Sequence, residues 1–94
     1  MKIFWSNHAQ ERFVERALIY GFTRTEVEYL VSKQLVRIDK GFDKKYSTNK
    51  FETIGLVGKI YLTIEKAEDS KKIFIITLWE SNKKEVDLWF SKQK

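Results

Sequence analysis

The chain has 94 residues, and its 18 Lys and Arg against 13 Asp and Glu give a formal net charge of +5. This length fits one small domain, 1–94, and 43% hydrophobic residues suffice for a packed core, which excludes a disordered chain. The absence of Cys excludes disulfides and thiolate metal sites, so we expect a cytoplasmic protein. No apolar run is long enough for a membrane span, and the basic balance favours an anionic partner, with nucleic acid first.

The first predicted helix spans residues 7–20. Ser6 and Asn7 both offer side-chain oxygens to its first amides, and Gln10 stands three residues after Asn7, as in a capping box. Gly21 is placed for the left-handed conformation that ends a helix. The stripe expected to face the core consists of Ala9, Phe13, Ala17 and Tyr20.

A row of three residues at a spacing of four runs beside this stripe: His8, Arg12 and Arg16. On a helix they stack roughly 6 Å apart along the axis, which suits a phosphate. We expect the row at the rim of the buried face, where partial desolvation and the neighbouring arginines favour a neutral imidazole. The alternative is a solvated helix face on which Glu11 and Glu15 form ordinary ion pairs with the arginines.

A second helix is predicted by the capping box between Thr23 and Glu26. Its apolar face would consist of Val27, Leu30, Val31 and Gln34. From Leu35 the pattern alternates as in a strand, and residues 41–44 predict a turn. Residues 45–50 suit either an exposed loop or an irregular edge strand.

The second half of the chain predicts a hairpin, a central strand and a helix. Residues 51–56 and 59–65 read as strands joined by a tight reversal near Val57, and a polar turn follows at 68–71. The nearly continuous apolar run 73–79 is typical of a central strand buried on both faces. A third capping box, between Asn82 and Glu85, opens a short helix that we expect to close the core with Val86, Trp89 and Phe90.

These elements predict an α+β domain: two N-terminal helices packed on a roughly four-stranded twisted antiparallel sheet, followed by a short C-terminal helix. The run His8-Ala9-Gln10-Glu11-Arg12-Phe13-Val14-Glu15-Arg16 fits a His-Ala-x-x-Arg-x-x-x-Arg pattern. With the capped helix and strands that follow, it resembles the RelE/ParE toxin superfamily. The likeness is closest to its BrnT-like branch and to related uncharacterised families with the same first helix. It is strong over residues 7–31, and beyond them the order of elements agrees.

The resemblance implies a single RelE/BrnT-like domain that acts as a metal-independent endoribonuclease of type II toxin–antitoxin systems. Such an enzyme cleaves mRNA, free or bound to the ribosome, by 2′-hydroxyl attack, needs no cofactor and pairs with an antitoxin. An acidic antitoxin would suit the charge of this chain. The alternative is a non-catalytic toxin or binding module, for example a gyrase inhibitor of the ParE type.

The candidate catalytic residues are His8, Arg12, Arg16, Lys59 and Thr77. His8 would exchange the proton, the two arginines would stabilise charge on the phosphate, and Lys59 and Thr77 would add a cation and a hydroxyl from the strands. The candidate RNA-binding residues are Lys44, Lys45, Tyr46, Lys50, Lys83 and Lys84. The basic segment 40–50 suits a solvated loop as well as a binding groove. One His, no Cys and scattered carboxylates leave no metal ligand set.

Overall fold

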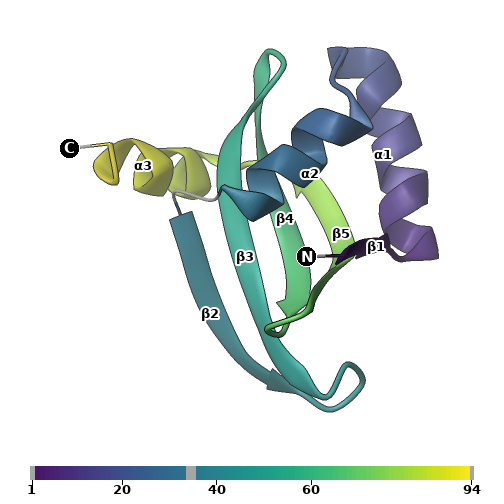
Figure 1. Cartoon of the computed structure of the whole chain (residues 1–94). Helices are drawn as coiled ribbons and strands as arrows, with labels where there is room; N and C mark the ends of the chain where they lie inside the picture. The colour runs from purple at the N-terminus through teal and green to yellow at the C-terminus, as the bar shows by residue number, and fades with distance from the viewer. Residues whose placement is uncertain (1, 34–35, 94) are drawn as a thin grey trace.

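The computed structural model describes residues 2–33 and 36–93, which form three helices and five strands (Figure 1). In chain order the elements are β1 (Lys2–Trp5), α1 (Asn7–Tyr20), α2 (Arg24–Ser32), β2 (Val36–Asp43), β3 (Thr48–Val57), β4 (Ile60–Glu68), β5 (Lys72–Glu80) and α3 (Lys83–Ser91). The α+β class is therefore confirmed. Gln34, expected on the face of the second helix, and Leu35, expected to open a strand, lie outside the described residues.

The sheet is five-stranded and mixed, which corrects the prediction of about four antiparallel strands. Its order is β1-β5-β4-β3-β2. Strands β2 to β5 pair antiparallel, whereas β1 lies parallel to β5, with Lys2 opposite Lys72 and Trp5 opposite Ile75. The sequence pattern missed β1 because four residues are too few to show an alternation, and its partner lies far along the chain.

Ser6 is the N-cap of α1, because its Oγ accepts a hydrogen bond of 2.9 Å from the amide of Ala9. The capping box expected between Asn7 and Gln10 does not form. With the cap at Ser6, the residue three positions later is Ala9, which has no side-chain acceptor to return. Gln10 Nε2 instead donates to the carbonyl of Trp5 at 3.4 Å.

The other helix ends agree with the sequence. Gly21 follows α1 in the left-handed conformation, with φ of 73°. Thr23 and Glu26 form the capping box of α2, and Asn82 and Glu85 form that of α3. The end of α1 and the starts of α2 and α3 were thus readable from local chemistry.

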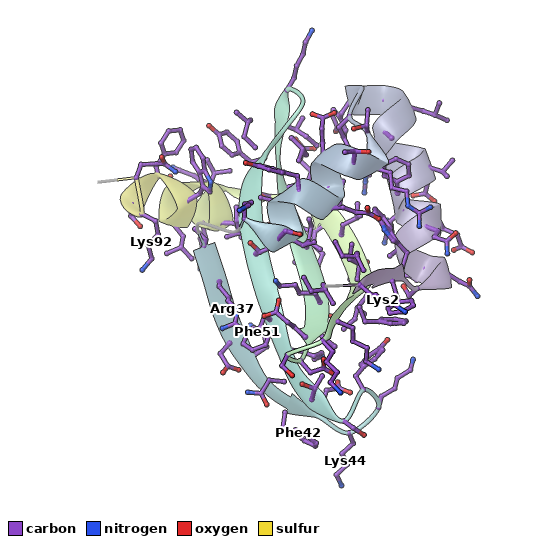
Figure 2. All side chains as sticks on the ribbon, in the orientation of Figure 1. Lys2, Arg37, Phe42, Lys44, Phe51 and Lys92 are labelled. Carbon is purple, nitrogen blue, oxygen red and sulfur yellow. The ribbon has the colours of Figure 1, made fainter. Side chains whose placement is uncertain are left out.

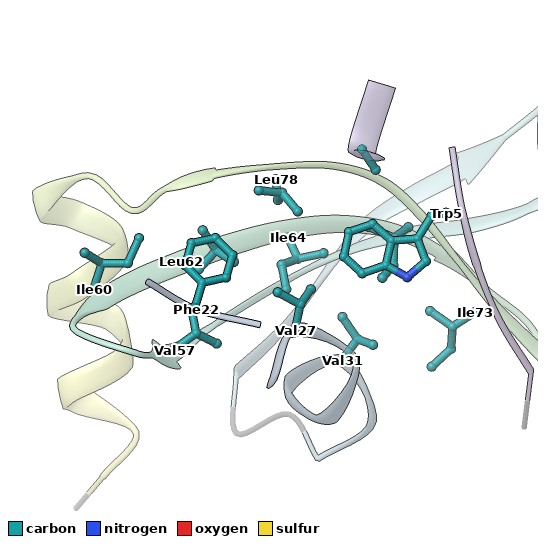
Figure 3. Packing of buried hydrophobic residues seen from close by; sticks show 12 residues of the cluster. Trp5, Phe22, Val27, Val31, Val57, Ile60, Leu62, Ile64, Ile73 and Leu78 are labelled. Atoms are coloured by element: carbon teal, nitrogen blue, oxygen red, sulfur yellow. The ribbon is translucent and has the colours of Figure 1, made fainter. Parts of the chain in front are cut away.

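The main core lies between the sheet and the two helices α1 and α2, which cover one face of it (Figures 1 and 3). We call this the inner face. Its buried residues are Trp5, Ala9, Phe22, Val27, Val31, Val57, Ile60, Leu62, Ile64, Ile73, Ile75 and Leu78. The stripe predicted on α1 packs here, and its Phe13 meets the rings of Trp5 and Phe22 edge-on at 5.5 and 5.7 Å.

The close approach of α2 to the sheet depends on Gly55 in β3. A Cβ at this position would clash with the side chain of Leu30 on α2. Glycine therefore lets the helix pack directly on the strand.

The outer face of the sheet is the face opposite α1 and α2, and α3 packs at one end of it. Trp89 of α3 lies 5.0 Å from the ring of Tyr61, and Trp79 Nε1 donates to Glu85 at 3.2 Å. No residue of α3 is buried. The expectation that this helix closes the main core is therefore wrong, because its aromatic residues cover the other side of the sheet.

Strand β5 is buried on one face only, which corrects the prediction of burial on both. Ile73, Ile75 and Leu78 are buried under the helices. Phe74 and Thr77 point to the outer face and are half-buried.

The turn expected at residues 41–44 is also wrong. Strand β2 continues to Asp43, the chain turns at 44–47, and β3 begins at Thr48. Gly41, with φ of 88°, instead accommodates a bulge after Asp39, whose carboxylate accepts from the Gly41 amide at 2.7 Å. A glycine in a bulge and a glycine in a turn give the same local sequence signal.

The reversal predicted near Val57 is confirmed, at Gly58 and Lys59. Lys59 is therefore in a turn rather than on a strand, as its proposed role had assumed.

Candidate functional site

The row of His8, Arg12 and Arg16 lies along β5, and hydrogen bonds at both ends of α1 fix its position. At the start of the helix, Ser6 Oγ donates to the carbonyl of Ile76 at 2.6 Å. At its end Tyr20, four residues after Arg16, donates through its hydroxyl to Glu80 Oε1 at 2.7 Å. Since both anchors lie on one stretch of β5, the helix that carries the row follows that stretch.

This stretch of β5, Ile76–Glu80, is a free strand edge. On that side β5 pairs with β1 only over residues 72–75, and no described strand continues the pairing. Helix α1 lies against the edge and covers it (Figure 1). The row is thus supported by a rigid element, as a binding site requires.

The charges of the row are only weakly neutralised. Arg12 Nη1 lies 3.8 Å from Glu15 Oε2, and the two side chains are 39% and 61% exposed, so the pair is loose and solvated. The solvated ion pairs expected as the alternative are therefore present at one of the two arginines. Arg16 is half-buried, and its Nε is buried without a hydrogen-bond partner among the described residues. Because Arg16 is only half-buried and no ion pair among the described residues includes it, its charge can interact with an anion.

His8 is exposed in the first turn of α1. The expectation that it lies at the rim of the buried face is therefore wrong. At the other end of the row, the hydrogen bond to Glu80 raises the pKa of Tyr20, and the charge of Arg16 opposes this shift. That opposition indicates that Arg16 lies near the Tyr20 hydroxyl.

Thr77 lies on β5, the strand against which α1 packs, whereas Lys59 lies near the C-terminal end of α1. Thr77 belongs to the free edge of β5, on the outer face, opposite Glu65 of β4. Lys59 lines a hollow with Tyr20 at the far end of α1. Along a helix, that end lies about 18 Å from His8, so a single phosphate cannot touch both side chains.

The candidate RNA-binding residues fall in separate places. Lys44, Lys45 and Tyr46 form the turn between β2 and β3, where Figure 2 shows Lys44 at the tip. Lys50 lies on β3, 3.4 Å from a carboxylate oxygen of Asp43. The last two, Lys83 and Lys84, are in the first turn of α3.

Two carboxylates on the outer face were not identified from the sequence. Glu52 of β3 and Glu65 of β4 are directly opposite, and Thr77 of β5 continues the same row. Burial raises the pKa of Glu52, the charge of Lys40 opposes this, and the charge of Glu65 adds to it. Like charges directly opposite each other destabilise a sheet, so this carboxylate pair is a candidate functional site. The predicted hairpin contained the signal, because a reversal at Gly58 and Lys59 puts Val57 opposite Ile60 and therefore Glu52 opposite Glu65.

A buried lysine was also missed. Lys66 is fully buried, and its Nζ donates to the carbonyl of Val31 at 3.1 Å and to Glu68 at 2.6 Å. Burial lowers its pKa, and Glu68 opposes the shift. Glu68 also accepts from Arg37 at 2.8 Å, and Arg37 lies 3.6 Å from the ring centre of Phe51 (Figure 2). This network joins α2 to three strands, which is a structural role.

Across residues 2–33 and 36–93, no three His, Asp or Glu side chains are grouped so that they could hold a metal ion. Nor does any helix in these ranges combine the length and apolar character needed to cross a membrane. Compared with models of known protein families and with proteins of curated function, the chain matches none of them.

Proposed function

We propose that the protein is a metal-independent endoribonuclease of the type II toxin–antitoxin kind, with a RelE-like fold, that cleaves mRNA in the cytoplasm. The observation that carries the proposal is the row on α1. It combines a titratable imidazole with two arginines, on a supported helix face, with only one loose ion pair. The net charge of +5 favours the approach of RNA.

In the proposed reaction, His8 takes the proton from the 2′-hydroxyl of one ribose. The 2′-oxygen then attacks the adjacent phosphorus, the bond to the 5′-oxygen breaks, and a 2′,3′-cyclic phosphate forms. The departing 5′-oxygen takes a proton from the imidazolium of His8 or from water. Arg12 and Arg16 stabilise the charge that develops on the phosphate.

The test is cleavage of a labelled single-stranded RNA in EDTA by wild-type protein, His8→Ala and the control Asn7→Ala. Asn7 is an exposed neighbour in the same turn and cannot exchange protons. We expect His8→Ala to lose roughly 10²–10⁴-fold in rate. We expect Asn7→Ala to cleave normally and products to end in a cyclic phosphate. RNA that stays intact with the wild type, both free and on translating ribosomes, would overturn the proposal.

A second candidate is a non-catalytic toxin that binds a protein, as a gyrase inhibitor does. It is favoured by an exposed apolar ridge on α1, where Val14, Leu18 and Ile19 are 56%, 83% and 68% exposed. In the first proposal this ridge would contact an acidic antitoxin. The candidates differ in cells: a binder keeps its toxicity in His8→Ala and loses it in Leu18→Ser, whereas a nuclease does the reverse.

A further inference from the structure

Three aromatic and three lysine side chains gather on the outer face beside the turn between β2 and β3. We call this set the aromatic–lysine patch; it consists of Lys2, Phe4, Lys45, Tyr46, Lys72 and Phe74. The parallel register of β1 and β5 places Lys2 beside Lys72 and Phe4 beside Phe74. Ile3 and Ile73, between them in the alternation, pack in the core, so these four side chains point outward.

The aromatic rings form a partly open platform. The rings of Tyr46 and Phe74 lie 5.2 Å apart at 42°, and Phe4 is 44% exposed. Lys45 Nζ lies 5.5 Å from the centre of the Tyr46 ring. A hollow of about 250 Å³ opens here, lined by Lys45, Tyr46, Thr48, Ala67, Asp69, Lys72 and Phe74. Small Ala67, opposite Phe74 on β4, leaves the ring accessible from that side.

The turn holds its two patch residues in place. Asp43 Oδ1 accepts from the amides of Lys45 and Tyr46, at 2.8 and 3.3 Å. A turn closed by its own aspartate presents these side chains at little further cost in conformational entropy.

The lysines of the patch keep their charge available. Asp69, the acidic residue of the hollow, is engaged by backbone: its Oδ1 accepts from the amides of Lys71 and Lys72 at 2.8 and 3.0 Å. Within the described residues, none of the ion pairs includes Lys2, Lys45 or Lys72. A ligand that carries both planar rings and negative charges could stack on the aromatic rings of the patch and bind its lysines.

We propose that the aromatic–lysine patch binds single-stranded RNA, with bases stacked on Phe4, Tyr46 and Phe74 and phosphates on the lysines. A single strand fits because its bases expose their faces, whereas a duplex hides them. The patch adjoins the row, since β1 leads from Phe4 directly into Ser6 and His8. It therefore holds the strand that the row cleaves, and in this respect the inference rests on the proposed function.

The test measures, by fluorescence anisotropy, the binding of a labelled 2′-O-methyl RNA. An RNA of about ten nucleotides is long enough to span a site of this kind. It cannot be cleaved by 2′-hydroxyl attack, so binding is separated from catalysis. We expect Tyr46→Ala and Phe4→Ala each to weaken binding about tenfold, and Tyr46→Phe to bind normally, since it keeps the ring. Lys45→Ala and Lys72→Ala should each reduce the slope of log affinity against log salt by about 0.7.

The matched controls are Phe42→Ala and Lys92→Ala. Both residues are exposed and lie outside the hollow (Figure 2). They should bind as the wild type does. Wild-type affinity in both aromatic variants would overturn the inference, even if the protein cleaves RNA. Polyglutamate binding that responds equally to Tyr46→Ala would also overturn it, because the patch would then recognise charge rather than bases.

Discussion

The inner and outer faces of one sheet are built from the same strands and have opposite characters. Under α1 and α2, the inner face is closed by fully buried aliphatic residues such as Leu62 and Ile64. The outer face carries α3 at one end, the carboxylates Glu52 and Glu65 in the middle and the aromatic–lysine patch at the other end. Alternate residues of each strand thus form the main core on one side. On the other side they form a smaller buried layer at Val36, Ile54 and Thr63, and polar groups lie beyond it.

One residue of the inner face departs from this contrast, because it carries a charge and is buried. Lys66 is fully buried there, beside Glu68. Polar groups in a closed layer are costly unless each is paired, whereas solvent satisfies those on an open face. Removing a carboxylate should therefore destabilise the protein much more on the inner face than on the outer face.

The largest effect is expected for Glu68→Ala. It leaves the buried ammonium of Lys66 without its partner and should lower the free energy of unfolding by about 3–5 kcal/mol. Glu65→Ala, on the outer face, should change it by less than about 0.5 kcal/mol. Urea unfolding measures both. Adding Lys66→Met to Glu68→Ala should recover part of the loss, and equal losses in Glu68→Ala and Glu65→Ala would contradict the contrast between the faces.

Gly55→Ala should come next, with a loss of about 1–3 kcal/mol by the same assay, because its Cβ clashes with Leu30. The double variant Gly55→Ala with Leu30→Ala should be more stable than the two single effects predict when added. Leu56→Ala, at the next position and 53% exposed, is the matched control and should have little effect. Strict additivity in the double variant would show that α2 does not press on β3 there.

The pH dependence of stability should also differ between a carboxylate of the inner face and one of the outer face. Burial alone would raise the pKa of Glu68, but hydrogen bonds from Lys66 and Arg37 lower it below 4.5. Its contribution is therefore full above its unfolded pKa and is lost as the pH falls through its folded value. The raised pKa of Glu52 has the opposite sign: it contributes below its unfolded pKa, and this is lost as the pH rises through the folded value.

Chemical unfolding at a series of pH values tests whether the contributions of Glu68 and Glu52 depend on pH in opposite directions. Glu68→Gln should flatten the loss of stability in acid, and Glu52→Gln should stabilise the protein near neutral pH. The same change of slope in both variants would be inconsistent with the two pKa directions.

The smallest effect is expected at the border of the two faces, on the row itself. Glu15→Gln removes the loose pair with Arg12 and should change stability by less than about 0.5 kcal/mol. It should still tighten binding of the uncleavable RNA, because one positive charge is released. Glu11→Gln is the control, because it also removes one negative charge from α1. Equal tightening in both variants would indicate a general charge effect instead.

The parts of the fold that depend on local chemistry were predictable. The cap at Thr23 and the left-handed Gly21 follow from side-chain and backbone preferences that act within a few residues. The parts that depend on pairing were not. Strand β1 and the bulge at Gly41 are fixed by partners elsewhere in the sheet, which no local pattern encodes.

The candidate site divides in the same way. The row was visible because His8, Arg12 and Arg16 share one helix, and helical spacing is fixed. The patch was only partly visible: Lys45 and Tyr46 were identified as basic and aromatic neighbours. Phe4, Lys72 and Phe74 joined them only through a parallel register between distant strands.

The parallel contact between β1 and β5 has a consequence for synthesis of the chain. Strand β1 cannot dock until residues 72–75 have left the ribosome, so Ile3 and Trp5 remain unshielded while residues 6–71 are made. Helix α1 gains its support at the same late moment, because Ser6 is anchored to β5. Any activity of the row is therefore delayed until translation has passed the last strand.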